Sequence, residues 1–152
     1  MPIDVGTIAP EFTLKTQDEK EWKLSDQKGK KNVVLLWYPL DWSPTCEKEN
    51  CKISKEPMLE GVDTVVVGIS RDSTWSHKAW KKAFSIKHDL LADPTLDVTK
   101  KYGLQHPVAS FISQRATVIV DKQGKVAFVG VQEKTGDERD WAPVQAALKS
   151  LK

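Results

Sequence analysis

Val33-Val34-Leu35-Leu36-Trp37 is an unbroken apolar run, and it leads directly into Tyr38-Pro39-Leu40-Asp41-Trp42-Ser43-Pro44-Thr45-Cys46. An apolar run of this kind is typical of a strand that is buried on both faces of a sheet. Ser43 is a good helix N-cap and Pro44 a good first helical residue, so a helix is expected to begin here. The two stretches together predict a buried strand followed by a helix, the repeating unit of α/β sheets.

Further strands follow from similar patterns. Residues 65–69 form a second apolar run and predict another buried strand. Residues 117–120 and 126–131 predict a hairpin around the turn Asp121-Lys122-Gln123-Gly124. Residues 11–15 and 22–24 predict a short N-terminal β-hairpin.

Apolar residues at helical spacing predict three more helices. The first is capped by Asp72 or Ser73, and its expected apolar face consists of Trp75, Ala79, Trp80, Ala83 and Phe84. A short helix is expected over residues 96–102, ending at Gly103. The last helix is expected from about Glu138, with one side formed by Trp141, Val144, Leu148 and Leu151. This order predicts an α/β fold with a mixed central β-sheet flanked by helices, and it resembles a thioredoxin-like fold.

Length and composition narrow the class of protein. The 152 residues predict one domain spanning residues 1–152, and the net charge of +2 gives no reason to expect nucleic-acid binding. No apolar run approaches the ~20 residues of a membrane helix, and the first residues do not resemble a secretory leader. We therefore expect a cytoplasmic protein that binds no membrane. In that compartment a disulfide between the two cysteines, Cys46 and Cys51, would be transient or catalytic.

Cys46 is the main candidate for chemistry. It falls in the first turn of the helix that begins after Ser43, where free N–H groups and the helix dipole favour an anion. A thiolate is therefore favoured at this position, and the thiolate is the nucleophilic form of cysteine. The alternative interpretation is a small buried apolar residue, because cysteine is among the most buried residue types.

These residues resemble a known family. Pro39, Ser43 and Cys46 match the Pro-x-x-x-Thr/Ser-x-x-Cys signature of peroxiredoxins, and Glu49 stands where many members carry Glu. Ala9-Pro10-Glu11-Phe12 and Arg115-Ala116-Thr117-Val118-Ile119-Val120-Asp121 are similar to two further segments of the family. The resemblance covers nearly the whole chain. Ser43 replaces the commoner Thr, and Trp42 stands where Phe or another large residue is usual.

The resemblance implies a role for each residue. Cys46 would be the peroxidatic nucleophile, and the Ser43 hydroxyl would hydrogen-bond the peroxide. Pro39 would shield the thiolate from water. Arg115 would stabilise both the thiolate and the charge that develops on the peroxide oxygens. Without the motif, Arg115 would be interpreted as a surface cation at the start of a strand.

Cys51 is the second candidate, five residues after Cys46. Q-type peroxiredoxins, the bacterioferritin comigratory protein subfamily, often carry their resolving cysteine at this spacing. Five residues along a helix separate Cα atoms by roughly 8–9 Å, whereas a disulfide requires about 6.8 Å or less. The helix would therefore have to unwind before the bond forms. A structural role for Cys51 is the alternative interpretation, because the segment Gly136-Asp137-Glu138-Arg139-Asp140-Trp141 is more similar to that of one-cysteine relatives.

The resemblance thus implies a peroxidase that reduces hydrogen peroxide and organic hydroperoxides. The Cys46 sulfenic acid would be resolved by Cys51 and recycled by thioredoxin or another dithiol, with no metal or cofactor, in a monomer or homodimer. The alternatives are a one-cysteine enzyme resolved by an external thiol, a thioredoxin-like disulfide oxidoreductase, and a non-catalytic binding module. Against the oxidoreductase, Glu49 stands where a Cys-x-x-Cys motif needs its second cysteine, and Ala116 where a cis-proline is expected.

The three histidines are scattered along the sequence. We interpret them as structural or surface residues: His77, His88 and His106.

Overall fold

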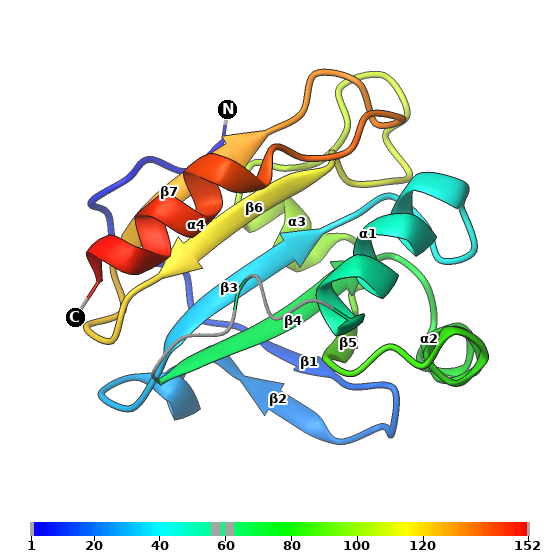
Figure 1. The fold of residues 1–152 in the computed structure, drawn as a ribbon, viewed down its shortest axis with the longest axis horizontal. Coiled ribbons are helices and arrows are strands. Elements are labelled where there is room, and N and C mark those ends of the chain that lie inside the picture. Colours follow the sequence, from blue (N-terminus) through cyan, green and yellow to red (C-terminus); the bar gives the residue numbers. More distant parts are fainter. Residues whose placement is uncertain (1, 56–58, 60–62, 152) are drawn as a thin grey trace.

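A computed structural model describes residues 2–55, 59 and 63–151 of the chain (Figure 1). Its centre is a seven-stranded sheet with the strand order β2-β1-β5-β4-β3-β6-β7. The strands are β1 (Thr13–Lys15), β2 (Glu21–Lys23), β3 (Asn32–Trp37), β4 (Thr64–Ser70), β5 (Asp89–Ala92), β6 (Ala116–Val120) and β7 (Val126–Val131). The helices are α1 (Pro44–Lys55), α2 (Thr74–Phe84), α3 (Asp97–Lys101) and α4 (Trp141–Ser150), with a 3₁₀ turn at Leu24–Gln27.

The sheet is mixed, as predicted. β3, β4 and β5 run parallel, whereas β6 and β7 on one side and β1 and β2 on the other are antiparallel to their neighbours. The predicted N-terminal hairpin is confirmed as β1 and β2, and it joins the sheet through the single pair Lys15 and Ala92. The predicted apolar run of β3 is buried along its whole length, because the parallel part of the sheet is covered on both faces.

Alternate residues of β3 point into different parts of the core. Val33, Leu35 and Trp37 pack against α3 and the N-terminal segment, in a cluster that includes Phe12, Trp22 and Tyr102. Val34 and Leu36 face the opposite side and pack with Val144 and Leu148 of α4. In Figure 1, α1 and α4 accordingly lie in front of the sheet and α3 lies behind it. Helices therefore flank both faces of the sheet.

One strand was missed and two sequence predictions are wrong in detail. β5 was not predicted, because its apolar run consists of only Leu90, Leu91 and Ala92. The last helix begins at Trp141 rather than near Glu138, because the Asp140 carboxylate accepts from the Ala142 N–H and caps it there. The buried stripe of α2 is Thr74, His77 and Trp80, whereas Trp75 is 77% exposed. That stripe contains a histidine, so an apolar pattern could not identify it.

The sheet brings distant parts of the sequence to one place. Trp37, the last residue of β3, pairs with Ala116, the first residue of antiparallel β6. Arg115 therefore lies at the end of β3 from which the chain continues into α1. In this way the fold places Arg115 beside the helix that carries Cys46.

Candidate active site

The loop between β3 and α1 is fixed from several sides. The Tyr38 carbonyl accepts from the Ser113 hydroxyl at 3.1 Å, and the Asp41 N–H donates to Asp72 Oδ2 at 2.8 Å. Trp42 follows with a φ of 71°, a left-handed conformation that is uncommon for a large residue. The anchored residues on its N-terminal side hold this turn in place. The turn at Trp42 leads directly to Ser43 and to the first turn of α1.

Asp41 is held by a buried polar network behind the loop. Its carboxylate accepts from the Tyr38 hydroxyl at 2.6 Å and from Ser76 Oγ at 2.9 Å, and it contacts His77 Nδ1 at 2.7 Å. His77 Nε2 lies 3.0 Å from the Leu91 carbonyl oxygen. Burial and the neighbouring Asp41 raise the pKa of Tyr38 well above its usual value. His77 thus supports the loop from α2, in agreement with the structural role expected of it.

Cys46 and Arg115 meet in the interior. Cys46 lies in the first turn of α1 and its side chain is 0% exposed. Arg115 NH2 lies 3.0 Å from Cys46 Sγ, and the guanidinium is itself 1% exposed. Because a guanidinium has donors and no acceptor, the sulfur must act as the acceptor in this contact. The contact is a charge-assisted hydrogen bond when the sulfur is a thiolate.

A second arginine, Arg139, belongs to the same cluster. Glu49 Oε1 accepts from Arg115 NH1 at 2.5 Å, and Glu49 Oε2 accepts from the Arg139 backbone N–H at 2.7 Å and from Arg139 Nε at 3.2 Å. Arg139 also donates to the carbonyl oxygens of Ala116 and Trp37, each at 2.8 Å. Sequence reasoning did not identify Arg139. In the sequence, Arg139 is simply an arginine in a stretch that is expected to form the polar start of a helix, so no pattern marks it as part of a site.

Without Cys46, the positive charges of this buried cluster outnumber its negative charges. Arg115 and Arg139 are both positive, Glu49 is negative, and all three are buried. Burial lowers the pKa of Arg139, yet an arginine keeps its proton in a protein. The three side chains therefore carry one net positive charge, which is costly to bury. A Cys46 thiolate would bring the net charge of the cluster to zero.

Ser43 and Pro39 lie on the loop before Cys46. The Ser43 hydroxyl donates to the Leu40 carbonyl at 3.1 Å, and the Ser43 carbonyl accepts from the Glu47 N–H at 2.9 Å. Because the Ser43 hydroxyl donates its proton to the Leu40 carbonyl, only the lone pairs of the Ser43 hydroxyl oxygen can bond another molecule. Pro39 is buried. The described contacts thus bring Cys46 and Arg115 together directly, and they place Ser43 one residue before the helix that carries Cys46.

Cys51 lies on the same helix as Cys46. α1 is continuous from Pro44 to Lys55, and neither Cys46 nor Cys51 forms a disulfide. Cys51 is half-buried, and its Sγ lies 3.9 Å from the Phe84 carbonyl oxygen at the end of α2. The helical spacing of the two cysteines is therefore confirmed, and in this wound helix Cys51 faces α2.

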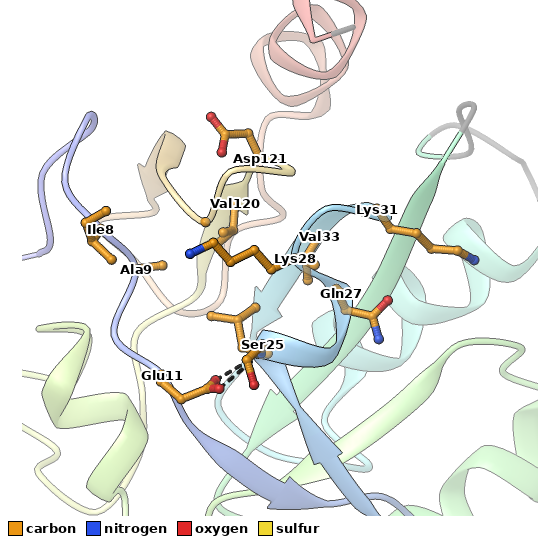
Figure 2. A pocket seen from close by; sticks show the side chains of 12 residues that line it. Ile8, Ala9, Glu11, Ser25, Gln27, Lys28, Lys31, Val33, Val120 and Asp121 are labelled. Atoms are coloured by element: carbon orange, nitrogen blue, oxygen red, sulfur yellow. Dashed lines mark hydrogen bonds between the residues drawn. The ribbon is translucent and has the colours of Figure 1, made fainter.

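A pocket at the other end of the sheet is separate from this cluster. It has a volume of about 150 Å³ and is lined by Val33 at the start of β3 and by Glu11, Lys28 and Asp121 (Figure 2). The Glu11 carboxylate there accepts from the Ser25 N–H at 3.0 and 3.2 Å. Its lining has neither cysteine. The converging buried charges, rather than this pocket, therefore mark the candidate active site.

Two further searches of the described residues gave negative results. Among residues 2–55, 59 and 63–151, no helix has the length and apolar character needed to span a membrane. In the same part of the chain, no three His, Cys, Asp or Glu side chains are grouped so as to hold a metal ion.

Comparisons with known proteins identify the family of this chain. Residues 5–129 match the model of the AhpC/TSA family. The chain is 36% identical over 135 residues to a putative peroxiredoxin bcp from Coxiella burnetii, covering 85% of this chain and 89% of the relative. It is also 36% identical over 128 residues to the chloroplastic peroxiredoxin Q of Triticum aestivum, covering 84% of this chain. The chain spans 58% of the length of that chloroplast protein.

A solved structure shares the architecture. The reduced 2-Cys peroxiredoxin of Plasmodium vivax superposes with a TM-score of 0.87 at 30% sequence identity, covering 98% of this chain and 82% of that one. The expected thioredoxin-like fold is confirmed by this likeness. The family match extends over most of the chain and includes Cys46 and Arg115. The chain therefore belongs to the AhpC/TSA family, the peroxiredoxins.

Proposed function

We propose that this protein is a thiol peroxidase that reduces hydrogen peroxide and organic hydroperoxides with Cys46. The observation that carries the proposal is the buried contact of 3.0 Å between Cys46 Sγ and Arg115, within a cluster that is neutral only when Cys46 is ionised. A buried thiolate held by a guanidinium is a nucleophile prepared for attack. No metal or organic cofactor takes part in this reaction.

In the first step, the Cys46 thiolate attacks one peroxide oxygen and the O–O bond breaks. The sulfur becomes a sulfenate, and the other oxygen leaves with the peroxide proton as water or an alcohol. The sulfenate then takes up one proton from the solvent and becomes the sulfenic acid. Arg115 stabilises the negative charge that develops on the oxygens. Ser43 donates to Leu40, so its hydroxyl accepts the proton of the incoming peroxide. Pro39 excludes water from the thiolate.

In the second step, the Cys51 thiol condenses with the Cys46 sulfenic acid, which forms the disulfide and releases water. A dithiol protein such as thioredoxin then reduces the disulfide by thiol exchange and is itself oxidised. The similarity to peroxiredoxin Q and to a putative peroxiredoxin bcp supports this two-cysteine cycle. The half-buried Cys51 supports it as well, because its sulfur lies at the contact between α1 and α2 rather than inside the core.

A second candidate is a one-cysteine peroxidase resolved by an external thiol. The continuous α1 favours it, because a wound helix keeps the two sulfurs apart. Mass spectrometry after one equivalent of peroxide separates the two candidates. We expect a Cys46–Cys51 disulfide, whereas a lasting sulfenic acid on Cys46 would favour the one-cysteine enzyme.

Peroxide consumption tests the activity itself. The Cys46→Ser protein should fold normally and consume no peroxide, because a hydroxyl is not ionised near neutral pH. Full turnover by Cys46→Ser would exclude Cys46 as the nucleophile and refute the proposed function.

A further inference from the structure

The helix that carries both cysteines is fastened to the segment before β5. Asn50 Nδ2 donates to the Cys46 carbonyl at 2.8 Å, and His88 Nε2 lies 2.6 Å from Asn50 Oδ1. One turn later, the Ser54 hydroxyl donates to the Asn50 carbonyl at 2.9 Å and accepts from the Lys87 N–H at 2.9 Å. We name the pair formed by Asn50 and His88 the clasp. It joins the middle of α1 to the chain that enters β5.

The clasp lies where α1 would have to unwind. Asn50 directly precedes Cys51, is buried, and bonds the carbonyl of Cys46. Moving Cys51 towards Cys46 breaks that bond and pulls Asn50 away from His88. We infer that the clasp holds α1 in the wound form that reacts with peroxide and must open before Cys51 reaches the Cys46 sulfenic acid. This inference rests on the proposed resolving role of Cys51, and it makes Asn50 and His88 positioning residues.

The contacts of the clasp fix the protonation state of His88. Asn50 Nδ2 donates to the Cys46 carbonyl, so Asn50 Oδ1 is the atom that faces the His88 ring. Because Oδ1 is an acceptor, His88 Nε2 must be the donor. His88 Nδ1 is shut off from solvent and has no hydrogen-bond partner among the described residues. A second proton there would be a buried donor without an acceptor. The clasped ring is therefore neutral.

Opening the clasp changes the proton affinity of His88. Burial lowers the pKa of the clasped ring to about 3, and the positive charges of Lys81 and Arg139 act in the same direction. A ring returned to water has a pKa of about 6.5. Below that pH the released ring binds a proton that the clasped ring does not bind. The wound helix therefore keeps this stabilisation above about pH 6.5 and loses it progressively as the pH falls towards about 3.

The other charged groups around His88 do not offset this effect. Lys81 reaches over from α2 and donates to the His88 carbonyl at 2.7 Å, and Arg139 is paired with Glu49. Both cations stay charged between about pH 3 and 6.5, so neither titrates in the range where His88 does. The condensation of a sulfenic acid with a thiol releases water and no net proton. The reaction of the thiolate with peroxide takes up one proton, so only proton uptake beyond that one reports the release of His88.

Nuclear magnetic resonance of the parent protein tests the clasp directly. In the reduced protein, the His88 ring should stay neutral down to about pH 4, whereas in the disulfide form it should titrate near 6.5. His106 serves as the internal control. Its Nδ1 accepts from the backbone N–H groups of Val108 and Ala109 and has no contact with the clasp, so its ring signals should be the same in both forms.

Rapid mixing with one equivalent of peroxide measures the rate of resolution. Asn50→Ala and His88→Phe each open the clasp, so the sulfenic acid should become disulfide roughly tenfold faster. His88→Gln retains a donor for Asn50 but cannot titrate. It should resolve as slowly as the parent at neutral pH, and the ratio of the parent rate to the His88→Gln rate should rise as the pH falls.

The outcomes separate this inference from the proposed function. If the disulfide forms but His88 titrates alike in both states, the clasp is refuted and the two-cysteine cycle stands. The same holds if Asn50→Ala and His88→Phe resolve at the parent rate. If peroxide is consumed and no disulfide forms, Cys51 has no resolving role. The inferred role of the clasp is then refuted as well, while Cys46 remains the nucleophile.

Discussion

At the scale of the residue, the proposed reactivity of Cys46 depends on buried charges rather than on exposure. The sulfur is fully buried, and its neighbour Arg115 is held in place by Glu49 at 2.5 Å and by the Thr135 carbonyl at 3.0 Å. A guanidinium fixed in this way needs little reorganisation when charge develops on the peroxide. The position of Arg115 is therefore as important as its charge.

Replacing Arg115 with Leu should slow the first peroxide reaction by about 100-fold or more, because one fixed transition-state donor is lost. The thiolate fraction of Cys46 should fall as well, since the remaining cluster no longer needs an anion. Pre-steady-state oxidation and the ultraviolet absorbance of the thiolate measure the two effects. Arg71→Leu, at an exposed arginine, is the matched control. A rate for Arg115→Leu within threefold of the parent would count against this role.

Arg139 should matter without touching the sulfur. Arg139→Leu removes the side-chain donors to Glu49 and to the carbonyl oxygens of Ala116 and Trp37, although the backbone N–H of residue 139 can still donate to Glu49. We expect a loss of about 3–5 kcal/mol in the free energy of unfolding, typical of a broken buried ion pair. The rate of Cys46 oxidation should also fall, because the net charge of the cluster drops by one. Urea unfolding and stopped-flow oxidation test both effects, and a stability loss with an unchanged rate would make Arg139 purely structural.

At the scale of the element, the proposed cycle requires two incompatible conformations of α1. As a wound helix, α1 places Cys46 beside Arg115 and directs Cys51 towards α2. To form the proposed disulfide, α1 would have to bring the two Cα atoms much closer than helix geometry permits. The proposed cycle therefore alternates between a wound and an unwound α1.

Cys51→Ser should leave the first peroxide reaction unchanged, because Cys51 does not reach the peroxide. Turnover with thioredoxin should fall sharply, and Cys46 should over-oxidise more readily to sulfinic acid. In the parent, hydrogen exchange of amides 45–54 should become faster after peroxide treatment, whereas in Cys51→Ser it should stay slow. Equal protection in the reduced and peroxide-treated parent would mean that α1 does not unwind.

At the scale of the whole molecule, the sequence predicted the features that lie close together in the chain. The strand before Pro39 and the helix that begins after Ser43 follow from one continuous stretch. Arg115 was identified through a family motif and not through any local pattern. Arg139 could not be identified, because its partner Glu49 is 90 residues away in the sequence and the contact exists only after the sheet has formed. His77 was missed in the buried stripe of α2 for a similar reason, since its partner Asp41 belongs to another element.

Trp42 gives the molecule an optical reporter of its own chemistry. Its indole is 51% exposed and stands edge-on to the Phe84 ring, with 6.0 Å between ring centroids. The carbonyl of the same Phe84 is the group that faces the Cys51 sulfur. If Cys51 leaves α2 to form the proposed disulfide, the surroundings of this indole change, and we expect its fluorescence to change with them. In a Trp75→Phe protein, which lacks the most exposed other indole, a change in emission that is lost in Trp42→Phe would follow the proposed cycle in real time.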